Sequence, residues 1–259
     1  MLAIDQALMA EWLARVFWPL CRLSGIFMVA PMLSHGAIPT RVKASLVLLI
    51  ALALAPTIDV GNPQYVFSHQ GVAIACREVL VGLMIGFAMR LVHMAAEVAG
   101  GLLGIQSGLA FASVYDHQAG SFGDPLSKFL QLCALMVFVS LNGHLLLIGT
   151  VAQSFETFPL ATGFEFGGGW AKDLLRLSGQ MMGFGLLLLM PMLVTLFIVT
   201  LLQGVLNRSA PQMNLFSVGF QISMIVALSM LVYTLNTFSR GLTSLYERAF
   251  SLVHGWLGF

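Results

Sequence analysis

The sequence predicts an all-α, integral-membrane protein built of helical hairpins, without a soluble domain. Residues 177–207 and 209–239 each run for 31 positions without a charged side chain. Since about 20 apolar residues in a helix cross the hydrocarbon core of a bilayer, each stretch is long enough to span it. The composition agrees: 58% of the residues are hydrophobic, 9% are charged against roughly 25% in soluble domains, and the mean hydropathy is +0.91.

The N-terminal part is expected to form three apolar helices. The first, residues 13–32, is interrupted by charged residues and by a proline, among them Arg15 and Pro19. The second, residues 44–58, is short for a complete crossing. A polar loop then leads to a third helix over residues 70–99. We therefore expect at least one of these segments not to cross the bilayer independently.

Asp124 and Pro125 mark the start of a further helix, because Asp caps helix N-termini and Pro fits the first helical position. This helix is expected to continue through the 27 uncharged residues 129–155, and a glycine-rich acidic loop, 156–170, follows it. The two long uncharged stretches come next. Residues 240–259 then place apolar side chains at helical spacing opposite a polar face, which is typical of an amphipathic helix at an interface or in a partner's groove.

Between the two long stretches lies the polar connector 207–214, Asn-Arg-Ser-Ala-Pro-Gln-Met-Asn, where we expect the chain to turn round. Its one charge is Arg208. Basic residues otherwise gather in a loop with Arg41 and Lys43, while two other loops contain none. By the positive-inside rule, the basic loops are expected to face the cytoplasm.

Gly100, Gly104 and Gly108, together with Ala112, recur at every fourth position. On a helix, this spacing makes a smooth ridge against which another backbone can pack closely. Residues 106–123, however, are small and apolar without a helical period. Such backbone is stable at membrane depth only when it is buried in protein or lines an aqueous path. The sequence thus leaves two interpretations, ordinary helix packing and a functional loop.

Four ionisable residues lie inside apolar segments, where charges are costly and usually face a cavity or one another: Arg22, Glu78, Arg90 and Glu97. Arg90 and Glu97 are seven residues apart and share one face of the predicted third helix. We interpret the four residues as ion pairs buried between helices or between subunits. A proton or ion relay is the alternative, although no second acidic residue accompanies Glu97 along its face.

No pattern of a known catalytic, metal or cofactor site is evident in the sequence. The six histidines lack the His-x-x-x-His spacing of zinc sites, and the three cysteines follow no metal spacing. The serine of residues 104–108 is one place late for a nucleophile elbow, and no glycine-rich phosphate loop occurs. The net charge of +1 without basic clusters gives no indication of nucleic-acid binding. We therefore expect a protein that is not an enzyme and binds no cofactor or metal.

Several motifs, in this order, resemble the export-gate family of type III secretion systems, the FliR/SctT family. They are Arg22-Leu23-Ser24-Gly25, Arg77-Glu78, the glycine motif at 100–108, Asp124-Pro125 and the connector with Arg208, Pro211, Gln212, Asn214 and Phe216. The resemblance covers nearly the whole chain, and the connector is its most specific part. The flagellar branch (FliR) and the injectisome branch (SctT) share these motifs, so both remain open, with the flagellar branch preferred.

The resemblance implies a subunit that forms, with FliP and FliQ, the closed channel through which unfolded flagellar proteins are exported. It implies a place in the flagellar basal body at the bacterial inner membrane, with FlhB and FlhA as further partners. It also implies a FliP-like part, residues 1–175, joined to a FliQ-like hairpin with the amphipathic helix, residues 176–259. In such assemblies, much of the apolar chain lies raised above the bilayer plane and is buried between subunits.

The resemblance further implies a loop at about 105–123 that plugs the channel. The residues expected at the gate are Gly108, Leu109, Ala110, Phe111 and Ala112, where a large ring excludes water and glycines let the backbone move. Within the connector, Arg208, Pro211, Gln212 and Asn214 are expected to contact a neighbouring subunit or a partner such as FlhB.

Two other classes of protein stay open. A small-solute transporter or channel would need solute-coordinating groups in broken helices and an internal repeat, neither of which is evident. A structural membrane scaffold would pack in the same way but without the central loop. Stability of the isolated chain discriminates between them, because a transporter should purify alone whereas a gate subunit should need partners.

Overall fold

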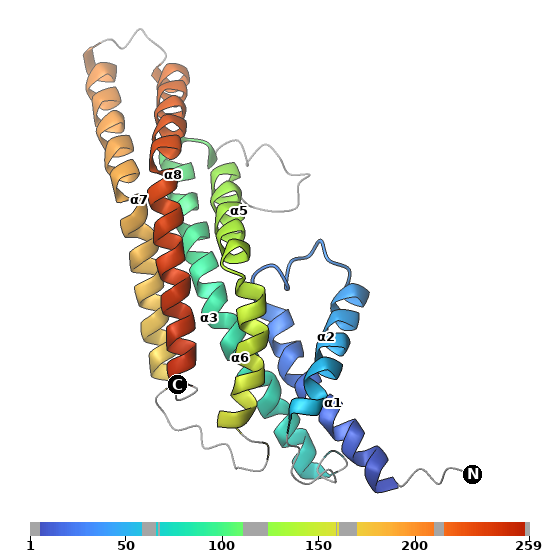
Figure 1. Cartoon of the computed structure of the whole chain (residues 1–259). Coiled ribbons are helices and arrows are strands. Elements are labelled where there is room, and N and C mark those ends of the chain that lie inside the picture. Colours follow the sequence, from blue (N-terminus) through green and yellow to red (C-terminus); the bar gives the residue numbers. More distant parts are fainter. Residues whose placement is uncertain are drawn as a thin grey trace. The chain divides into compact units, whose positions relative to one another are not determined.

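The computed structural model describes residues 6–58, 66, 68–110, 124–158, 160, 170–209 and 215–256. Within these residues, the regular structure is helical, without strands, which confirms the all-α prediction (Figure 1). Five of the described helices are long and apolar enough to cross a membrane, and the bent pair α5 and α6 would add a sixth span. The apolar residues that predicted a membrane protein therefore lie in helices long enough to cross a bilayer.

Helices α1 (Gln6–Val29) and α2 (Thr40–Leu54) lie side by side, and the short 3₁₀ turn η1 (Ala55–Thr57) follows α2 (Figure 1). The predicted interruption of the first segment is wrong, because α1 continues through Pro19. A proline in a helix removes one backbone hydrogen bond but does not have to end the helix. Arg15 also fits within α1, since its Nη2 pairs with Oε1 of Glu11 one turn earlier at 2.7 Å.

Helix α3 (His69–Ser107) extends eight residues beyond the predicted end at residue 99. Glycine is a poor helix former, so a run with three glycines favours an early end. Close packing on these glycines compensates for that tendency. Gly100 lies against the backbone of Ser127, and Gly104 lies against the carboxylate of Asp124.

The predicted start at Asp124 is confirmed: its side chain caps α5 (Pro125–Ser140) and accepts a hydrogen bond from the Ser127 N–H at 3.2 Å. The predicted continuous helix over 129–155, however, is two helices. Asn142 adopts a left-handed conformation with φ of 53°, and α6 (Gly143–Thr157) begins after it. Asparagine tolerates this conformation better than most residues, which makes Asn142-Gly143 a natural place for a helix to break.

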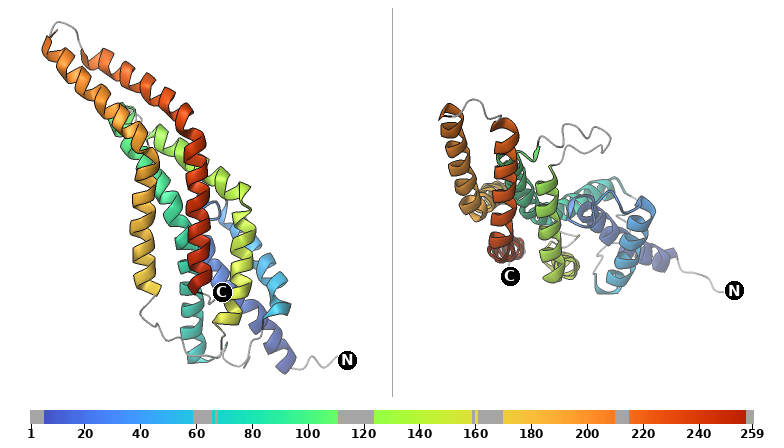
Figure 2. Two further views of the ribbon diagram at one scale, coloured as in Figure 1. Left: turned by 60° about the vertical axis from the view of Figure 1, so that its left-hand side comes forward. Right: turned by 90° about the horizontal axis from the view of Figure 1, so that it is seen from above.

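Helices α7 (Trp170–Ser209) and α8 (Leu215–Trp256) run antiparallel and side by side (Figures 1 and 2). Their ends fit the predicted hairpin, although residues 210–214 lie outside the described residues. The amphipathic pattern predicted over 240–259 is present in its described residues, with Leu242, Leu245 and Ala249 buried and Ser244, Glu247 and Arg248 exposed, but these residues continue α8 and do not form a helix of their own. Helix α8 continues without interruption across residue 240, so the apolar stretch and the amphipathic stretch form one helix.

The chain forms two compact units, each assembled from separate stretches. The first comprises residues 1–90, 142–175 and 248–259, and the second comprises residues 91–141 and 176–247. Large, completely buried side chains form the core of each: Trp18, Leu23, Ile26 and Leu147 in the first, and Leu103, Leu130, Phe138, Phe238 and Tyr246 in the second. The predicted division into a FliP-like part, residues 1–175, and a FliQ-like part, residues 176–259, stays a prediction.

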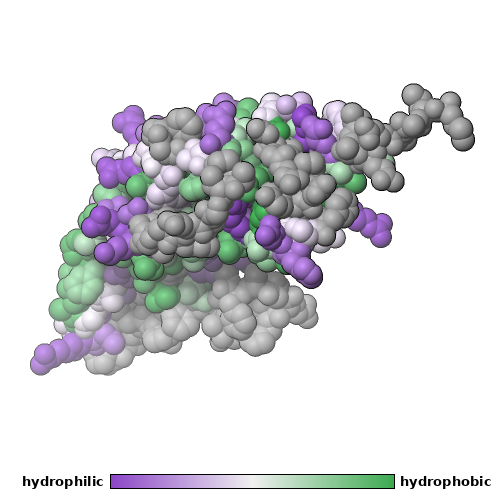
Figure 3. All heavy atoms as spheres, turned by 90° about the horizontal axis from the view of Figure 1, so that it is seen from below, coloured by the Kyte–Doolittle hydropathy of each residue, from purple (hydrophilic) through white to green (hydrophobic). Residues whose placement is uncertain are grey.

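Many large apolar side chains are also exposed. Val232 and Tyr233 on α8 are 77% and 84% exposed, and Val205 on α7 is 66% exposed. On the face drawn in Figure 3, hydrophobic and hydrophilic residues lie side by side. Exposed apolar surface on this scale marks contact with lipid or with other proteins.

Candidate functional site

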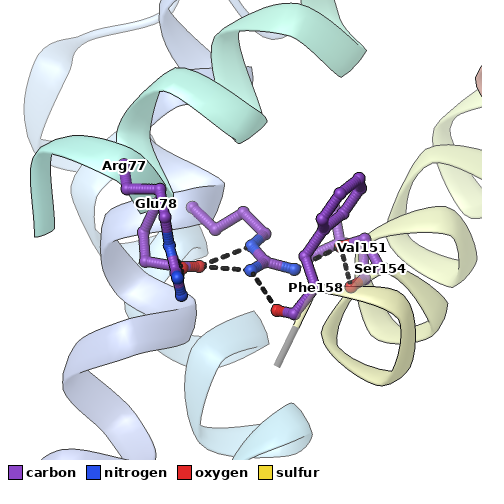
Figure 4. Close-up of polar contacts among 6 residues, drawn as sticks. Arg77, Glu78, Val151, Ser154 and Phe158 are labelled. Atoms are coloured by element: carbon purple, nitrogen blue, oxygen red, sulfur yellow. Dashed lines mark hydrogen bonds and ion pairs between the residues drawn. The ribbon is translucent and has the colours of Figure 1, made fainter. Parts of the chain in front are cut away.

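A buried polar cluster in the first unit centres on Arg22 of α1. Its Nε donates a hydrogen bond to Oε2 of Glu78 on α3 at 2.6 Å, and its Nη2 forms an ion pair with the same oxygen at 2.5 Å. Its Nη1 donates to Oγ of Ser154 on α6 at 2.6 Å, and Nη2 donates to the carbonyl oxygen of Phe158 at 3.3 Å. In Figure 4, Arg77 and Glu78 approach from one side, and Ser154 and Phe158 from the other. One side chain of α1 thereby joins α3 and α6.

The cluster is buried, and its one carboxylate is shared by two guanidinium groups. The side chains of Arg22 and Glu78 have no exposed surface. Arg77 donates from Nε and Nη2 to Oε1 of Glu78 at 3.1 and 2.9 Å, so both carboxylate oxygens accept. The guanidinium carbon of Arg22 lies 3.6 Å from the ring centroid of Phe155, a cation–π contact. A lone carboxylate bonded to two arginines is an arrangement that holds helices together.

Small residues let α1 and α3 approach closely beside this cluster. A Cβ built on Gly82 of α3 would overlap the carbonyl oxygen of Arg22, and one on Gly25 of α1 would overlap the carbonyl oxygen of Val79. The two helices therefore meet backbone to backbone. The geometry explains why the motif with Arg22 also contains a glycine three residues later.

The structure brings two of the four predicted ionisable residues, Arg22 and Glu78, together. Arg90 and Glu97 are half-buried on α3, and the part of the chain that the structure describes gives neither of them an ion pair. Their pairing stays a prediction. Among the described residues, no group of three or more His, Cys, Asp or Glu side chains is arranged to hold a metal ion.

The predicted gate segment begins at the end of α3 in the second unit. Gly108 has a φ of +82°, and its N–H donates to the carbonyl oxygen of Ile105 at 3.2 Å. The ring of Phe220 on α8 lies directly against Gly108. Leu109 and Ala110 are half-buried, while Phe111 and Ala112 lie outside the described residues. The structure thus defines where this segment departs from α3.

The same glycine ridge holds the place where the segment returns, at the start of α5. The hydroxyl of Ser127 donates to the carbonyl oxygen of Glu97 at 2.8 Å, and a Cβ on Gly104 would overlap the Asp124 carboxylate. Burial raises the pKa of the Asp124 carboxyl, and hydrogen bonds from the backbone N–H groups of Ser127 and Leu126 partly offset this. The helix-packing interpretation therefore holds for Gly100 and Gly104, whereas the loop interpretation concerns mostly residues outside those described and stays a prediction.

The connector is described only at its edges. Arg208 is exposed in the last turn of α7, where a positive charge complements the helix dipole, and Pro211, Gln212 and Asn214 lie outside the described residues. Just before it, Gln203 donates from Nε2 to the carbonyl oxygen of Gly219 at 2.9 Å and to Oγ of Ser223 at 3.0 Å.

The sequence analysis did not identify several residues that make these contacts: Ser154, Phe155, Phe158, Gln203 and Phe220. Each acts through a neighbour distant in sequence, so no local pattern marks it. For Gln203 alone a signal exists, since a lone amide in an uncharged apolar stretch needs a hydrogen-bond partner.

Comparisons with known proteins agree with this architecture. The family described as "Bacterial export proteins, family 1" matches residues 13–249. The chain is 33% identical over 253 residues to the flagellar biosynthetic protein FliR of Pectobacterium carotovorum subsp. carotovorum, covering 98% of this chain and 96% of that protein. It is 31% identical to FliR of Escherichia coli (strain K12), with the same coverage.

A relative with a different name has a lower identity to this chain than these two. The surface presentation of antigens protein SpaR of Shigella sonnei is 27% identical over 209 residues, covering 80% of this chain and 79% of that protein. The family match covers all or most of every described helix, and the sequence identity to two relatives exceeds 30% over nearly the full length. The chain therefore belongs to the family of bacterial export proteins, family 1.

Proposed function

We propose that the chain is a subunit of the flagellar type III protein export gate, which forms with FliP and FliQ the closed channel for unfolded flagellar proteins. FlhB and FlhA are the proposed further partners, and the bacterial inner membrane at the flagellar basal body is the proposed location. Family membership supports this function, and the identities of 33% and 31% to two FliR proteins, against 27% to SpaR, favour the flagellar branch.

The observation that carries the proposal is the length of the exposed apolar surface on α7. Large exposed apolar side chains follow one another from Leu187 to Leu206, and one more, Leu175, lies 12 residues before them. At 1.5 Å per residue, the continuous set is about 28 Å long and Leu175 lies about 18 Å beyond it, whereas the hydrocarbon core is about 30 Å thick. A typical tilt of about 20° removes only a few ångströms of the difference. Because a core of this thickness does not reach both Leu175 and Leu206, we infer that protein neighbours cover part of these side chains.

The internal polar groups fit a structural and gating subunit. The Arg22–Glu78 cluster is buried and paired, which suits a rigid scaffold. We assign channel closure to the segment at 105–123, with Gly108, Leu109, Ala110, Phe111 and Ala112 near the axis. Partner contact is assigned to Arg208, Pro211, Gln212 and Asn214. Catalysis, cofactors and metals have no part in this function.

Deleting the gene in its own host, with plasmid complementation, tests the proposal. We expect cells without flagella that fail to secrete flagellar proteins, and both defects should be reversed by the plasmid. Normal flagella together with a lost secretion of virulence proteins would assign the chain to an injectisome instead. Normal flagella and normal secretion would refute an export function.

Removal of residues 109–114 tests the gate assignment separately. We expect the shortened chain to co-purify with the same partner subunits, while the membrane of cells that express it leaks ions and small solutes. Unchanged conductance in an assembled complex would show that the segment does not close the channel.

A further inference from the structure

Gly108 fixes the point from which the proposed gate segment leaves α3. Its φ of +82° lies in the left-handed region, and its N–H is bonded to Ile105 one turn back. A residue with a Cβ is strained in this conformation, and glycine is not. The turn at Gly108 is therefore a defined structure that can be held or released.

The aromatic ring of Phe220 covers this turn. A Cβ on Gly108 would overlap three atoms of the ring, Cδ1, Cε1 and Cζ. Phe220 is half-buried and lies in the second turn of α8. Glycine at position 108 thus serves two purposes, the left-handed turn and the contact with the ring.

The turn of α8 that carries Phe220 is itself tied to α7. Gln203 donates to the carbonyl oxygen of Gly219, the residue directly before Phe220, and to the hydroxyl of Ser223 in the next turn. In sequence, the connector 210–214 joins these same two helix ends. A continuous chain of contacts therefore leads from the hairpin end through Phe220 to Gly108.

We propose that Phe220 is a positioning residue for the gate segment: its ring holds the turn at Gly108 and couples that turn to the α7–α8 hairpin. This inference rests on the proposed role of the segment in channel closure. The contact joins two regions that are about 100 residues apart in sequence.

Thiol labelling of the full-length chain in mild detergent tests the contact. Leu109→Cys places a reporter beside the turn, labelling is measured separately at each cysteine, and the half-buried native Cys133, in the same unit as Phe220, reports unfolding of that unit. We expect Phe220→Ala to raise the rate of iodoacetamide labelling at position 109 by about tenfold, with the rate at Cys133 unchanged. Phe220→Tyr should keep the slow rate. Ile222→Ala, which removes an exposed apolar side chain from the same region of α8, is the matched control and should have no effect.

Equal labelling rates with and without the ring would overturn the proposal, as would an equal response to Ile222→Ala. If Phe220→Ala unfolds the second unit, so that Cys133 also reacts faster, the milder Phe220→Leu provides the same test, with a smaller rise expected at position 109.

A double variant tests whether the ring and the turn act together. Gly108→Ala should accelerate labelling at position 109, and Gly108→Ala with Phe220→Ala should accelerate it by less than the product of the two single effects, because the overlap with the ring is then gone. Independent effects would contradict the coupling. Ion leakage of cells that carry Phe220→Ala separates this inference from the proposed function: faster labelling without leakage refutes closure by this segment and leaves the contact intact.

Discussion

The Arg22 cluster and the α7–α8 hairpin differ in what holds their helices together and in how much apolar surface they expose. In the cluster, α1, α3 and α6 are joined by a buried ion pair, hydrogen bonds and backbone contacts at glycines. The hairpin exposes large apolar side chains, and one amide, Gln203, links its two helices near the connector. The polar contacts of the first region lie within the chain, whereas the second leaves apolar surface for lipid or protein neighbours. Mutations should therefore affect folding in the first region and assembly or export in the second.

The largest effect on stability is expected from Glu78→Ala, which leaves the buried Arg22 without its anion. Loss of one partner from a buried ion pair costs about 3–5 kcal/mol of unfolding free energy. Unfolding of the purified chain by denaturing detergent, followed by circular dichroism, measures this loss. Glu11→Ala, which removes the exposed partner of Arg15, is the control and should cost about 1 kcal/mol or less. If the two variants were equally stable, the cluster would not hold α1, α3 and α6 together.

A second effect is expected where glycine permits close backbone contact. Gly82→Ala should destabilise the chain by about 1–3 kcal/mol, because its Cβ would overlap the carbonyl oxygen of Arg22. Gly183→Ala on α7 is the matched control, since nothing lies within 4 Å of its built Cβ. Alanine is the better helix former, so this control should stabilise the isolated chain by up to about 1 kcal/mol. Unfolding by denaturing detergent measures both variants. If Gly183→Ala destabilised the chain and Gly82→Ala did not, close backbone contact at Gly82 would not stabilise the protein.

A smaller effect is expected at the polar link of the hairpin. Gln203→Leu removes hydrogen bonds to Gly219 and Ser223 and should cost about 1 kcal/mol. Gln221→Leu, an exposed amide on α8, should leave the stability unchanged. Hydrogen exchange of the first turns of α8 is the more local measurement. Faster exchange there in Gln203→Leu would support the role of these hydrogen bonds in joining α7 to α8. Identical exchange in the variant and the wild type would show that they do not stabilise the start of α8.

The smallest effect on stability, and a large one on function, is expected from Arg208→Ala. An exposed surface substitution typically changes the unfolding free energy by no more than about 0.5 kcal/mol. Secretion of flagellar proteins should nevertheless fall, because the proposed partner contact loses its one positive charge. Motility at the wild-type level would reduce Arg208 to a solvated residue that complements the dipole of α7.

Local signals in the sequence predicted the parts of the fold that depend on neighbouring residues. Asp124-Pro125 marked the start of α5 because the cap and the first turn are made within four positions. Uncharged runs likewise revealed α7 and α8. The break at Asn142 was missed because apolar periodicity continues across it, and only the backbone conformation changes. The extension of α3 was missed because it depends on packing against Asp124 and Ser127.

The candidate sites show the same limit. Charges inside apolar runs identified Arg22 and Glu78 as residues that need partners, but no pattern indicated that Ser154 and Phe158 would supply the remaining hydrogen bonds. The glycine spacing indicated close packing without naming Phe220 as the contact of Gly108. Contacts between residues far apart in sequence depend on how helices pack, and a single sequence does not contain that information locally.

The central claim is that protein neighbours, and not lipid alone, cover the exposed apolar face of the hairpin. Photo-crosslinking in living cells tests it most directly, with a photoreactive amino acid placed singly at Tyr233, Val205 and Leu175, three highly exposed positions. We expect stable protein adducts of defined size from at least one of these positions, and none in cells that lack the other gate subunits. Adducts to lipid alone at all three positions would contradict the account.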